Sequence, residues 1–293
     1  MYTKKSLSNI INEIEDKIQT KINSIDTISG GCICNSFVIT DINHVKYFLK
    51  TKTNSDNLFR CENNGLIALK KNNEINTPKI IGYSENYLLL EFIETGIKNS
   101  VFFKNFGIQL AKMHKVNYSY FGFNENNFIG QTEQINIPNK TEKNNWQEFY
   151  WNKRLLFQIN LAYTNKLLKK NEFLNFIKLE NKIEVILKNS EESPSLIHGD
   201  LWSGNYICDQ NQTPYLIDPA VYYGHREAEL AMTKLFGGFT PEFYYFYNQT
   251  YPLKDGFEDR EPLYKLYHIL NHLNLFGRNY IEEAKSILMF YGI

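Results

Sequence analysis

The segment 198–205, with the sequence HGDLWSGN, constrains the fold of this chain more than any other feature. It contains Asp200, which is followed by Asn205 five positions later and by Asp218 thirteen positions after that. A short apolar run lies before the segment, and another comes just before Asp218. Polar residues between short apolar runs indicate a loop held by strands at both ends. A plain β-hairpin with an acidic loop is the simpler alternative, but it does not explain why the whole string and the later aspartate occur together.

These residue types at this spacing suit phosphoryl transfer. That reaction needs a carboxylate that orients the attacking hydroxyl and oxygen ligands that hold Mg²⁺ against the nucleotide phosphates. One short loop can supply the base, Asp200, and a metal ligand, Asn205, while Asp218 after the next strand supplies a second metal ligand. The pattern therefore predicts a kinase-like phosphotransferase that uses ATP and Mg²⁺.

Composition limits the class of protein. The chain has 293 residues, of which 43% are hydrophobic and 15% aromatic, as in a globular protein with a sizeable core. Lys plus Arg and Asp plus Glu both number 32, so charge gives no reason to expect nucleic acid or a membrane as partner. The sequence contains no apolar run near the roughly 20 residues of a membrane span and no apolar signal core. We therefore expect a cytoplasmic protein.

Cysteine usage indicates no disulfide framework. The four cysteines, at 32, 34, 61 and 208, are too few and too scattered for a stapled secreted scaffold. Cys32 and Cys34 form a close pair, but no second pair of Cys or His follows at zinc spacing. Small packing residues are the simplest interpretation of this pair.

The first 91 residues predict a small lobe built on an antiparallel sheet. Apolar residues recur at helical spacing from Leu7 to Ile22, and a second helix is expected at 56–71. Short β-like runs lie between and after these helices. The expected strands are 25–28, 37–40, 45–50, 80–83 and 87–90.

Helical periodicity dominates after Glu91, interrupted by strands only at 195–218. Residues 92–96 are expected to form a hinge, 97–293 a larger, mainly helical lobe, and 117–144 a long loop. The predicted class is α+β, a bilobal protein-kinase-like fold. Helices are expected at 99–115, 145–165, 171–188, 225–236 and 259–290.

The small lobe carries residues suited to a nucleotide. Gly30 and Gly31 lie between two expected strands, where glycines let the backbone approach phosphates, although no Walker A sequence follows. Lys50 ends a strand and can contact the α- and β-phosphates; Lys52, on the same strand face, is the competing candidate. Glu62 in the next helix is the expected acidic partner of Lys50. In the hinge, backbone groups of Glu91, Phe92 and Ile93 can bind an adenine edge.

Several segments together resemble the fructosamine kinase, or ketosamine-3-kinase, family, which belongs to the larger aminoglycoside phosphotransferase and choline kinase group. The HGD-x-x-x-x-N string alone points only to that larger group. The narrower resemblance also rests on IDPAVYYGHRE, KLFGGF and YHILNHLNLFG, and similarity extends to Phe128-Ile129-Gly130, Trp146, Tyr150 and Arg154.

The resemblance implies that ATP phosphorylates the 3-hydroxyl of a ketosamine, either a small molecule or a glycated protein lysine. Phosphorylation destabilises the adduct, so the implied biology is deglycation or metabolite repair. Asp200 would be the base, Asn205 and Asp218 would hold Mg²⁺, and His198 and Gly199 would shape the loop. Gly199 replaces the Arg of protein kinases, so activity should not require phosphorylation.

The resemblance also suggests acceptor residues. Trp202, next to the base, is a candidate sugar platform, with a core aromatic as the alternative. His272 is a second candidate for substrate contact. His225, Glu227 and His268 also match family positions, but buried, hydrogen-bonded histidines are common, and structural roles are at least as well supported for all of these matches.

Other interpretations stay open at this point. The acceptor can be an aminoglycoside, choline or a plain sugar, although the carboxy-terminal part has no dense acidic run to attract such cations. A non-catalytic nucleotide-binding protein is the alternative from a different class. Cys32, if exposed in a phosphate loop, is a candidate for oxidation, so either a monomer or a redox-sensitive dimer through Cys32 is expected.

Overall fold

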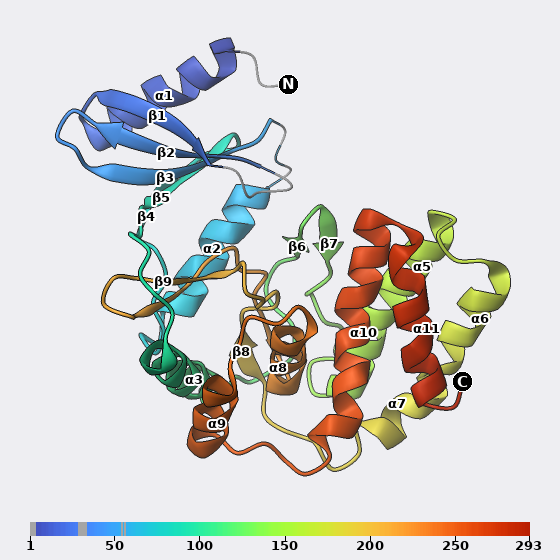
Figure 1. The fold of residues 1–293 in the computed structure, drawn as a ribbon. Coiled ribbons are helices and arrows are strands. Elements are labelled where there is room, and N and C mark those ends of the chain that lie inside the picture. Colours follow the sequence, from blue (N-terminus) through green and yellow to red (C-terminus); the bar gives the residue numbers. More distant parts are fainter. Residues whose placement is uncertain (1–3, 29–33, 54, 56) are drawn as a thin grey trace.

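The computed structural model describes residues 4–28, 34–53, 55 and 57–293 (Figure 1). The amino-terminal part is a five-stranded antiparallel sheet with a helix on each face, and the larger remainder is mainly helical. The predicted α+β class, with a small lobe built on an antiparallel sheet and a larger helical lobe, is therefore confirmed. The boundary between the lobes and the hinge at 92–96 stay predictions; β5 ends at Glu91 and the next helix begins at Ser100.

The sheet has the strand order β1-β2-β3-β5-β4, and each neighbouring pair is antiparallel. Every expected strand is present, with small differences at the ends. Within the sheet, Lys50 pairs with Ser36 of β2 and with Leu88 of β5. The strands are β1 (Ile22–Ile28), β2 (Asn35–Asp41), β3 (Lys46–Thr51), β4 (Ile80–Tyr83) and β5 (Tyr87–Glu91).

Two helices cover the two faces of the sheet. α1 (Lys4–Ile18) places Ile10 and Ile14 against Leu49 and neighbouring residues of one face. α2 (Leu58–Lys70) packs against the other face, where Leu88 belongs to its apolar cluster. Because side chains alternate along a strand, Lys50 points to the α2 face, opposite to Leu49. The alternation thus brings Lys50 to the helix that carries Glu62.

The first helix is shorter than predicted. α1 ends at Ile18, and Ile22, which the periodicity assigned to the helix, is the first residue of β1. Gln19 has a φ of 56°, in the left-handed region, which ends the helix. The spacing of isoleucines continued across this break and concealed it.

The larger part is built from helices around one extensive apolar core. Helices fill the predicted segments 99–115, 145–165, 171–188 and 225–236, two of them as several consecutive helices. The helices before the segment 195–224 are α3 (Ser100–His114), α4 (Trp146–Tyr150), the π-helix η1 (Trp151–Leu156), α5 (Phe157–Thr164), α6 (Lys170–Lys178) and α7 (Glu180–Ile186). After it come α8 (Arg226–Leu235), α9 (Pro241–Thr250), α10 (Phe257–Phe276), the short 3-10 helix η2 (Arg278–Tyr280) and α11 (Ile281–Phe290).

Three features of this part differ from the sequence prediction. The single helix expected at 259–290 is wrong: α10 ends before Gly277, whose φ of 90° favours glycine, and α11 turns back beside α10 (Figure 1). α9 occupies a segment to which no element was assigned. The long loop at 117–144 contains a short hairpin, β6 (Asn127–Ile129) and β7 (Thr132–Gln134).

α9 packs closely against α3 because one glycine allows it. A Cβ on Gly107 would lie 2.3 Å from the carbonyl oxygen of Phe243, so only glycine fits at this crossing. Beside it, the buried rings of Phe106 and Phe243 are 5.2 Å apart. This aromatic packing holds α3 and α9 together.

No helix in the described part of the chain is long and apolar enough to cross a membrane.

Candidate active site

Two small sheets hold the segment 195–224, which contains the predicted base and metal ligands and is called the catalytic segment below. β8 (Ser195–Ile197) pairs with β11 (Tyr222–Gly224), and β9 (Tyr206–Cys208) pairs with β10 (Pro214–Leu216). The loop 198–205 therefore leaves β8 and enters β9, while 217–221 connects β10 to β11. Two hydrogen bonds join the loops: Ala220 N–H donates to the His198 carbonyl at 2.9 Å, and Ile217 N–H donates to the Asn205 carbonyl at 3.1 Å.

Gly199 is required by this close approach of the two loops. Its φ is 85°, and a Cβ would lie 2.1 Å from the carbonyl oxygen of Ala220. Any other residue would be strained and would also collide with the backbone. Position 199 is thus closed to a side chain in this protein.

His198 supports the same loop from the protein interior. It is fully buried; Nε2–H donates to the carbonyl of Ile217 at 2.7 Å, and Nδ1 accepts the N–H of Asp200 at 3.3 Å. Burial lowers the pKa of His198, which keeps the ring neutral and fits this division of donor and acceptor. His198 therefore orients the backbone at Asp200.

Asp200 and Asn205 face each other across the loop. The amide nitrogen of Asn205 donates to the main-chain oxygen of Asp200 at 2.8 Å and to its carboxylate Oδ2 at 3.1 Å. Burial raises the pKa of Asp200 well above its usual range, and the negative charge of Asp218 raises it further, against the effect of the Asn205 hydrogen bond. Asp200 is thus a stronger base than an exposed aspartate.

Lys50, Glu62 and Asp218 meet in one cluster, as the sequence predicted for Lys50 and Glu62. Lys50 Nζ donates to Glu62 Oε1 at 2.7 Å and also to Asp218 Oδ1. Burial alone would lower the pKa of Lys50, but the charges of Asp218 and Glu62 outweigh it and raise that pKa. Burial raises the pKa of Glu62 to about 7, and the nearby Asp218 adds to this because two carboxylates share one ammonium.

Asp218 lies at the open side of the cluster. The Lys50 and Glu62 side chains are each 9% exposed, whereas that of Asp218 is 42% exposed. Asp218 also has a φ of 57°, an uncommon conformation that Asp tolerates better than most residues and that often marks functional sites. One carboxylate oxygen binds Lys50, and the group remains accessible for a further ligand.

The metal assignment to Asn205 and Asp218 stays a prediction. Among the described residues, no group of three or more His, Cys, Asp or Glu side chains could hold a metal ion. Mg²⁺ does not need such a group, because in nucleotide sites it keeps waters and takes one or two protein oxygens together with phosphate oxygens. The half-exposed carboxylate of Asp218 fits that coordination.

Glu229 is a site residue that the sequence analysis missed. From α8, its Oε1 accepts the N–H of Gly199 at 2.9 Å, and its Oε2 contacts His114 Nε2 on α3 at 2.8 Å. Nδ1 of His114 contacts the hydroxyl of Tyr247 on α9 at 2.8 Å. A buried carboxylate thus ties the residue before Asp200 to two distant helices. The available signal in the sequence was an acidic residue, Glu229, at the start of the otherwise apolar run 229–232.

Gln134 on β7 supports the other loop and was also missed. Its amide nitrogen donates to the carbonyl of Ala220 at 2.8 Å, and its oxygen accepts from the hydroxyl of Tyr267 at 3.0 Å. Arg154, buried in the π-helix, stacks 3.9 Å above the ring of Tyr222. These contacts fix residues 220–222, and no local sequence pattern reveals them.

The residues suggested for acceptor contact fall into two groups. Trp202 is 37% exposed and His272 is half-buried, so both can be reached. His225 caps α8 and is buried, with its Nε2–H donating to the Ser190 carbonyl at 2.7 Å. Glu227 forms a buried ion pair with Arg260, and burial lowers the pKa of His268 to about 3. His225, Glu227 and His268 are thus in buried surroundings typical of residues with structural roles.

The predicted phosphate loop and the predicted adenine contacts in the hinge both stay predictions. Gly30, Gly31 and Cys32 lie outside the described residues, so the phosphate-loop and redox hypotheses stay predictions. In the strand before the proposed hinge, the Glu91 carboxylate accepts the N–H of Lys79 at 3.0 Å, and Ile93 is buried. A role for this backbone in binding adenine likewise stays a prediction.

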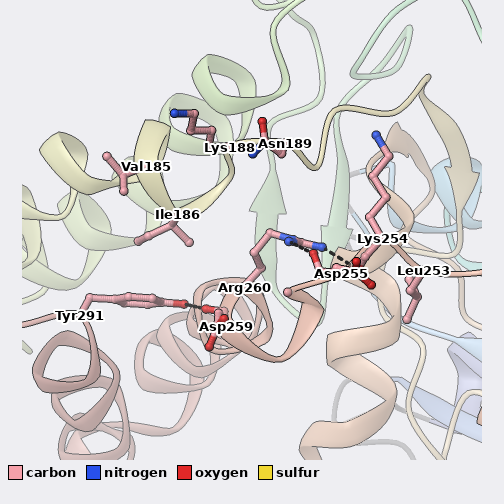
Figure 2. Close-up of a pocket in the computed structure, with 11 residues that line it drawn as sticks. Val185, Ile186, Lys188, Asn189, Leu253, Lys254, Asp255, Asp259, Arg260 and Tyr291 are labelled. Atoms are coloured by element: carbon pink, nitrogen blue, oxygen red, sulfur yellow. Dashed lines mark hydrogen bonds between the residues drawn. The ribbon is translucent and has the colours of Figure 1, made fainter.

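One cavity lies away from these loops. It has a volume of about 840 Å³ and lies between α7, the start of α10 and Tyr291 (Figure 2). The guanidinium of Arg260 borders it but is already paired with Glu227. None of the predicted site residues lines this cavity, so the candidate site rests on the catalytic loops.

Comparison with known proteins places the chain in a family. The sequence model of the fructosamine kinase family matches residues 4–291. A "Probable ketoamine kinase" of Lactiplantibacillus plantarum is 37% identical over 93% of this chain and 95% of its own length. A "Protein-ribulosamine 3-kinase, chloroplastic" of Oryza sativa subsp. japonica is 38% identical over 92% of this chain and 79% of its own length.

Solved structures of other proteins agree with this family assignment and with the fold. A Thermobifida fusca structure named "putative fructosamine-3-kinase" superposes with a TM-score of 0.87 at 27% identity, covering 96% of this chain and 97% of that one. A choline kinase from Streptococcus pneumoniae shares the fold, with a TM-score of 0.62 at 16% identity over 98% and 99% of the two chains. The chain has the fold of a kinase-like phosphotransferase. It belongs to the fructosamine kinase family, which confirms the resemblance inferred from its sequence.

Two nearby lysines, Lys50 in β3 and Lys52 just after it, provide a matched test. Lys50 is buried between two carboxylates, whereas Lys52 is half-buried and has no ion pair among the described residues. We expect Lys50→Ala to lower kcat at least about 100-fold, as removal of a charged transition-state contact does. Lys52→Ala should change kcat less than about twofold. Steady-state kinetics on both variants checks this, and equal losses would contradict the assignment of Lys50.

Glu229 is expected to act as a positioning residue. Glu229→Ala leaves the N–H of Gly199 without its acceptor, and kcat should fall about 10- to 100-fold with little change in the KM for ATP. Glu229→Gln keeps an acceptor oxygen and should restore most of the activity. Kinetics below the melting temperature of each variant separates this effect from unfolding. Equal kcat losses in the two variants would rule out positioning through the Gly199 hydrogen bond.

Proposed function

We propose that this protein is an ATP-dependent kinase that phosphorylates a sugar hydroxyl of a ketosamine. The observation that carries the proposal is the assembly of Lys50, Glu62 and Asp218 beside a loop that presents Asp200 and Asn205. Membership of the fructosamine kinase family implies use of ATP. The names of the rice and Lactiplantibacillus relatives support a ketosamine acceptor.

The proposed roles follow from the local geometry. Asp200 accepts the proton of the attacking hydroxyl; its raised pKa makes it a better acceptor than an exposed aspartate. Asn205 orients the Asp200 carboxylate through its amide nitrogen, which leaves its oxygen for the metal. Lys50 contacts the ATP phosphates as a fixed positive charge, and Glu62 holds it in place.

Asp218 changes partner in this proposal. Its carboxylate pairs with Lys50 and is nonetheless 42% exposed. Mg²⁺, when bound by Asp218 and Asn205, would neutralise charge on the ATP phosphates. With the nucleotide bound, Lys50 would contact the phosphates in place of Asp218, and the Asp218 carboxylate would be free to hold the metal. Lys50 stays paired with Glu62 throughout, so its charge is never left alone in the buried site.

Both free and protein-bound ketosamines are candidate acceptors. The rice relative's name refers to protein ribulosamine, which favours a glycated lysine side chain. Such an enzyme would take part in deglycation, because phosphorylation destabilises the adduct. Another small hydroxyl compound is the alternative acceptor and would require the same phosphate chemistry.

The test is ATP consumption with Mg²⁺ and a panel of acceptors: ribulosyl-lysine, fructosyl-lysine, an aminoglycoside and choline. We expect turnover of a ketosamine that Asp200→Asn lowers about 10²- to 10⁴-fold, the range for loss of a general base. Chelation of Mg²⁺ by EDTA should also stop it. Turnover of the aminoglycoside or choline alone would contradict the ketosamine assignment and leave the phosphotransferase mechanism standing.

A further inference from the structure

The cavity of Figure 2 has no part in the proposed reaction. It has a volume of about 840 Å³ and lies between the end of α7, the segment 253–260 and Tyr291. It is called the α7–α10 cavity below. Protein cavities of about 300–1,000 Å³ commonly hold small organic ligands. No described residue that was assigned to the reaction lines this one, so a ligand bound there would be neither the nucleotide nor the acceptor.

Hydrogen bonds hold the walls of the α7–α10 cavity in place. Arg260, which is 4% exposed, donates to the carbonyl of Asp255 at 2.8 Å and to that of Lys254 at 3.2 Å. Its guanidinium is also paired with a buried carboxylate of α8. On another side, the hydroxyl of Tyr291 donates to the carbonyl of Asp259 at 2.8 Å. A site whose walls are already ordered loses less conformational entropy when a ligand binds.

Part of the cavity lining is apolar. Figure 2 shows Val185, Ile186 and Tyr291 on one side of the cavity and Leu253 on another. Val185 is 71% exposed, and the other three are half-buried. Apolar side chains gathered in a concave site favour a ligand that has a hydrophobic part.

The same cavity carries charges of both signs that do not neutralise one another. Four exposed charged side chains line it: Lys188, Lys254, Asp255 and Asp259. Among the residues that the structure describes, none of these four forms an ion pair, and the Lys254 ammonium binds a main-chain carbonyl. The Arg260 guanidinium is already neutralised by its partner on α8. A ligand that has both an ammonium and a carboxylate can therefore pair with both kinds of charge.

We propose that the α7–α10 cavity binds a short peptide of two or three residues with free ends. The carboxylate of the peptide lies at Lys188 and Lys254, and its ammonium lies at Asp255 and Asp259. Its aliphatic side chains pack against Val185 and the neighbouring apolar wall. The cavity has room for more than one amino acid, and the apolar wall gives the side chains a surface to cover.

Other ligands fit this lining less well. A phosphate or a nucleotide would pair with the two lysines but would also face two carboxylates, and a polyamine would meet the reverse situation. A neutral apolar ligand would take water away from all four charges and give them no partner, which is unfavourable. The mixture of charges therefore selects a zwitterion.

The test is isothermal titration calorimetry of the full-length protein with the dipeptide leucyl-leucine. We expect saturable binding, and acetyl-leucyl-leucine amide, in which both ends are blocked, should bind at least about tenfold more weakly because both ionic contacts are lost. Leucyl-leucine should also raise the melting temperature of the protein more than the blocked peptide does at the same concentration. Neither measurement uses ATP or an acceptor, so failure of this proposal and failure of the proposed function are distinguishable.

Two variants identify which end of the peptide lies where. Lys188→Gln should weaken the binding of leucyl-leucine about three- to tenfold but should not change the affinity for leucyl-leucine amide, which has no carboxylate. Asp255→Asn should weaken the binding of leucyl-leucine similarly but should not change the affinity for acetyl-leucyl-leucine, which has no ammonium. Lys182→Gln removes an exposed lysine of α7 that does not line the cavity, and this matched control should change none of these affinities. Because all three side chains are exposed, the variants should fold, which a thermal melt verifies.

Several results would overturn the assignment of the α7–α10 cavity to a peptide. They are the absence of saturable leucyl-leucine binding up to about 10 mM, equal affinities for the free and the blocked peptide, and unchanged binding in both Lys188→Gln and Asp255→Asn. Saturable binding of inorganic phosphate without binding of leucyl-leucine would assign the cavity to an anion and would equally contradict the proposal.

Discussion

The buried ammonium of Lys50 is the charged centre among the contacts that join the small lobe to the helical part. It lies between Glu62 of the small lobe and Asp218 of the catalytic segment, residues that are far apart in sequence. Removing one member of such a buried cluster leaves a charge without compensation, which is far more costly than losing an exposed ion pair. The position of Asp218 relative to the small lobe therefore depends in part on Lys50, and the strand alternation in β3 determines where Lys50 points.

The catalytic loop depends on a second set of constraints. Gly199 lets two loops approach each other, and Glu229, His198 and Gln134 fix them from different sides. Each contact satisfies a buried backbone group, so each contributes to stability as well as to geometry. Asp200 occupies the point at which these supports converge. Its raised pKa arises from the same burial that makes the loop rigid.

The sequence predicted the features that depend on local pattern. An expected strand ending at Lys50, followed by a helix carrying a possible acidic partner, was sufficient to predict the contact between Lys50 and Glu62. The spacing after Asp200 singled out Asn205 and Asp218, whose roles as metal ligands stay predictions. Features that depend on distant contacts were not predictable in this way. Glu229 is recognisable as a support only once α8 is known to pack beneath Gly199. Similarly, the apolar period of the last helical segment continued through Gly277, and only the backbone conformation there divides α10 from α11.

The most direct test of this account is the affinity for ATP, measured by calorimetry with and without Mg²⁺. Glu62→Gln should weaken ATP binding in both conditions, because it loosens the Lys50 contact to the phosphates. Asp218→Asn should bind ATP without Mg²⁺ about as well as the wild-type protein, but should lose the increase in affinity that Mg²⁺ provides. If Asp218→Asn kept the full Mg²⁺-dependent increase, the exchange of partners at Lys50 and Asp218 would be wrong.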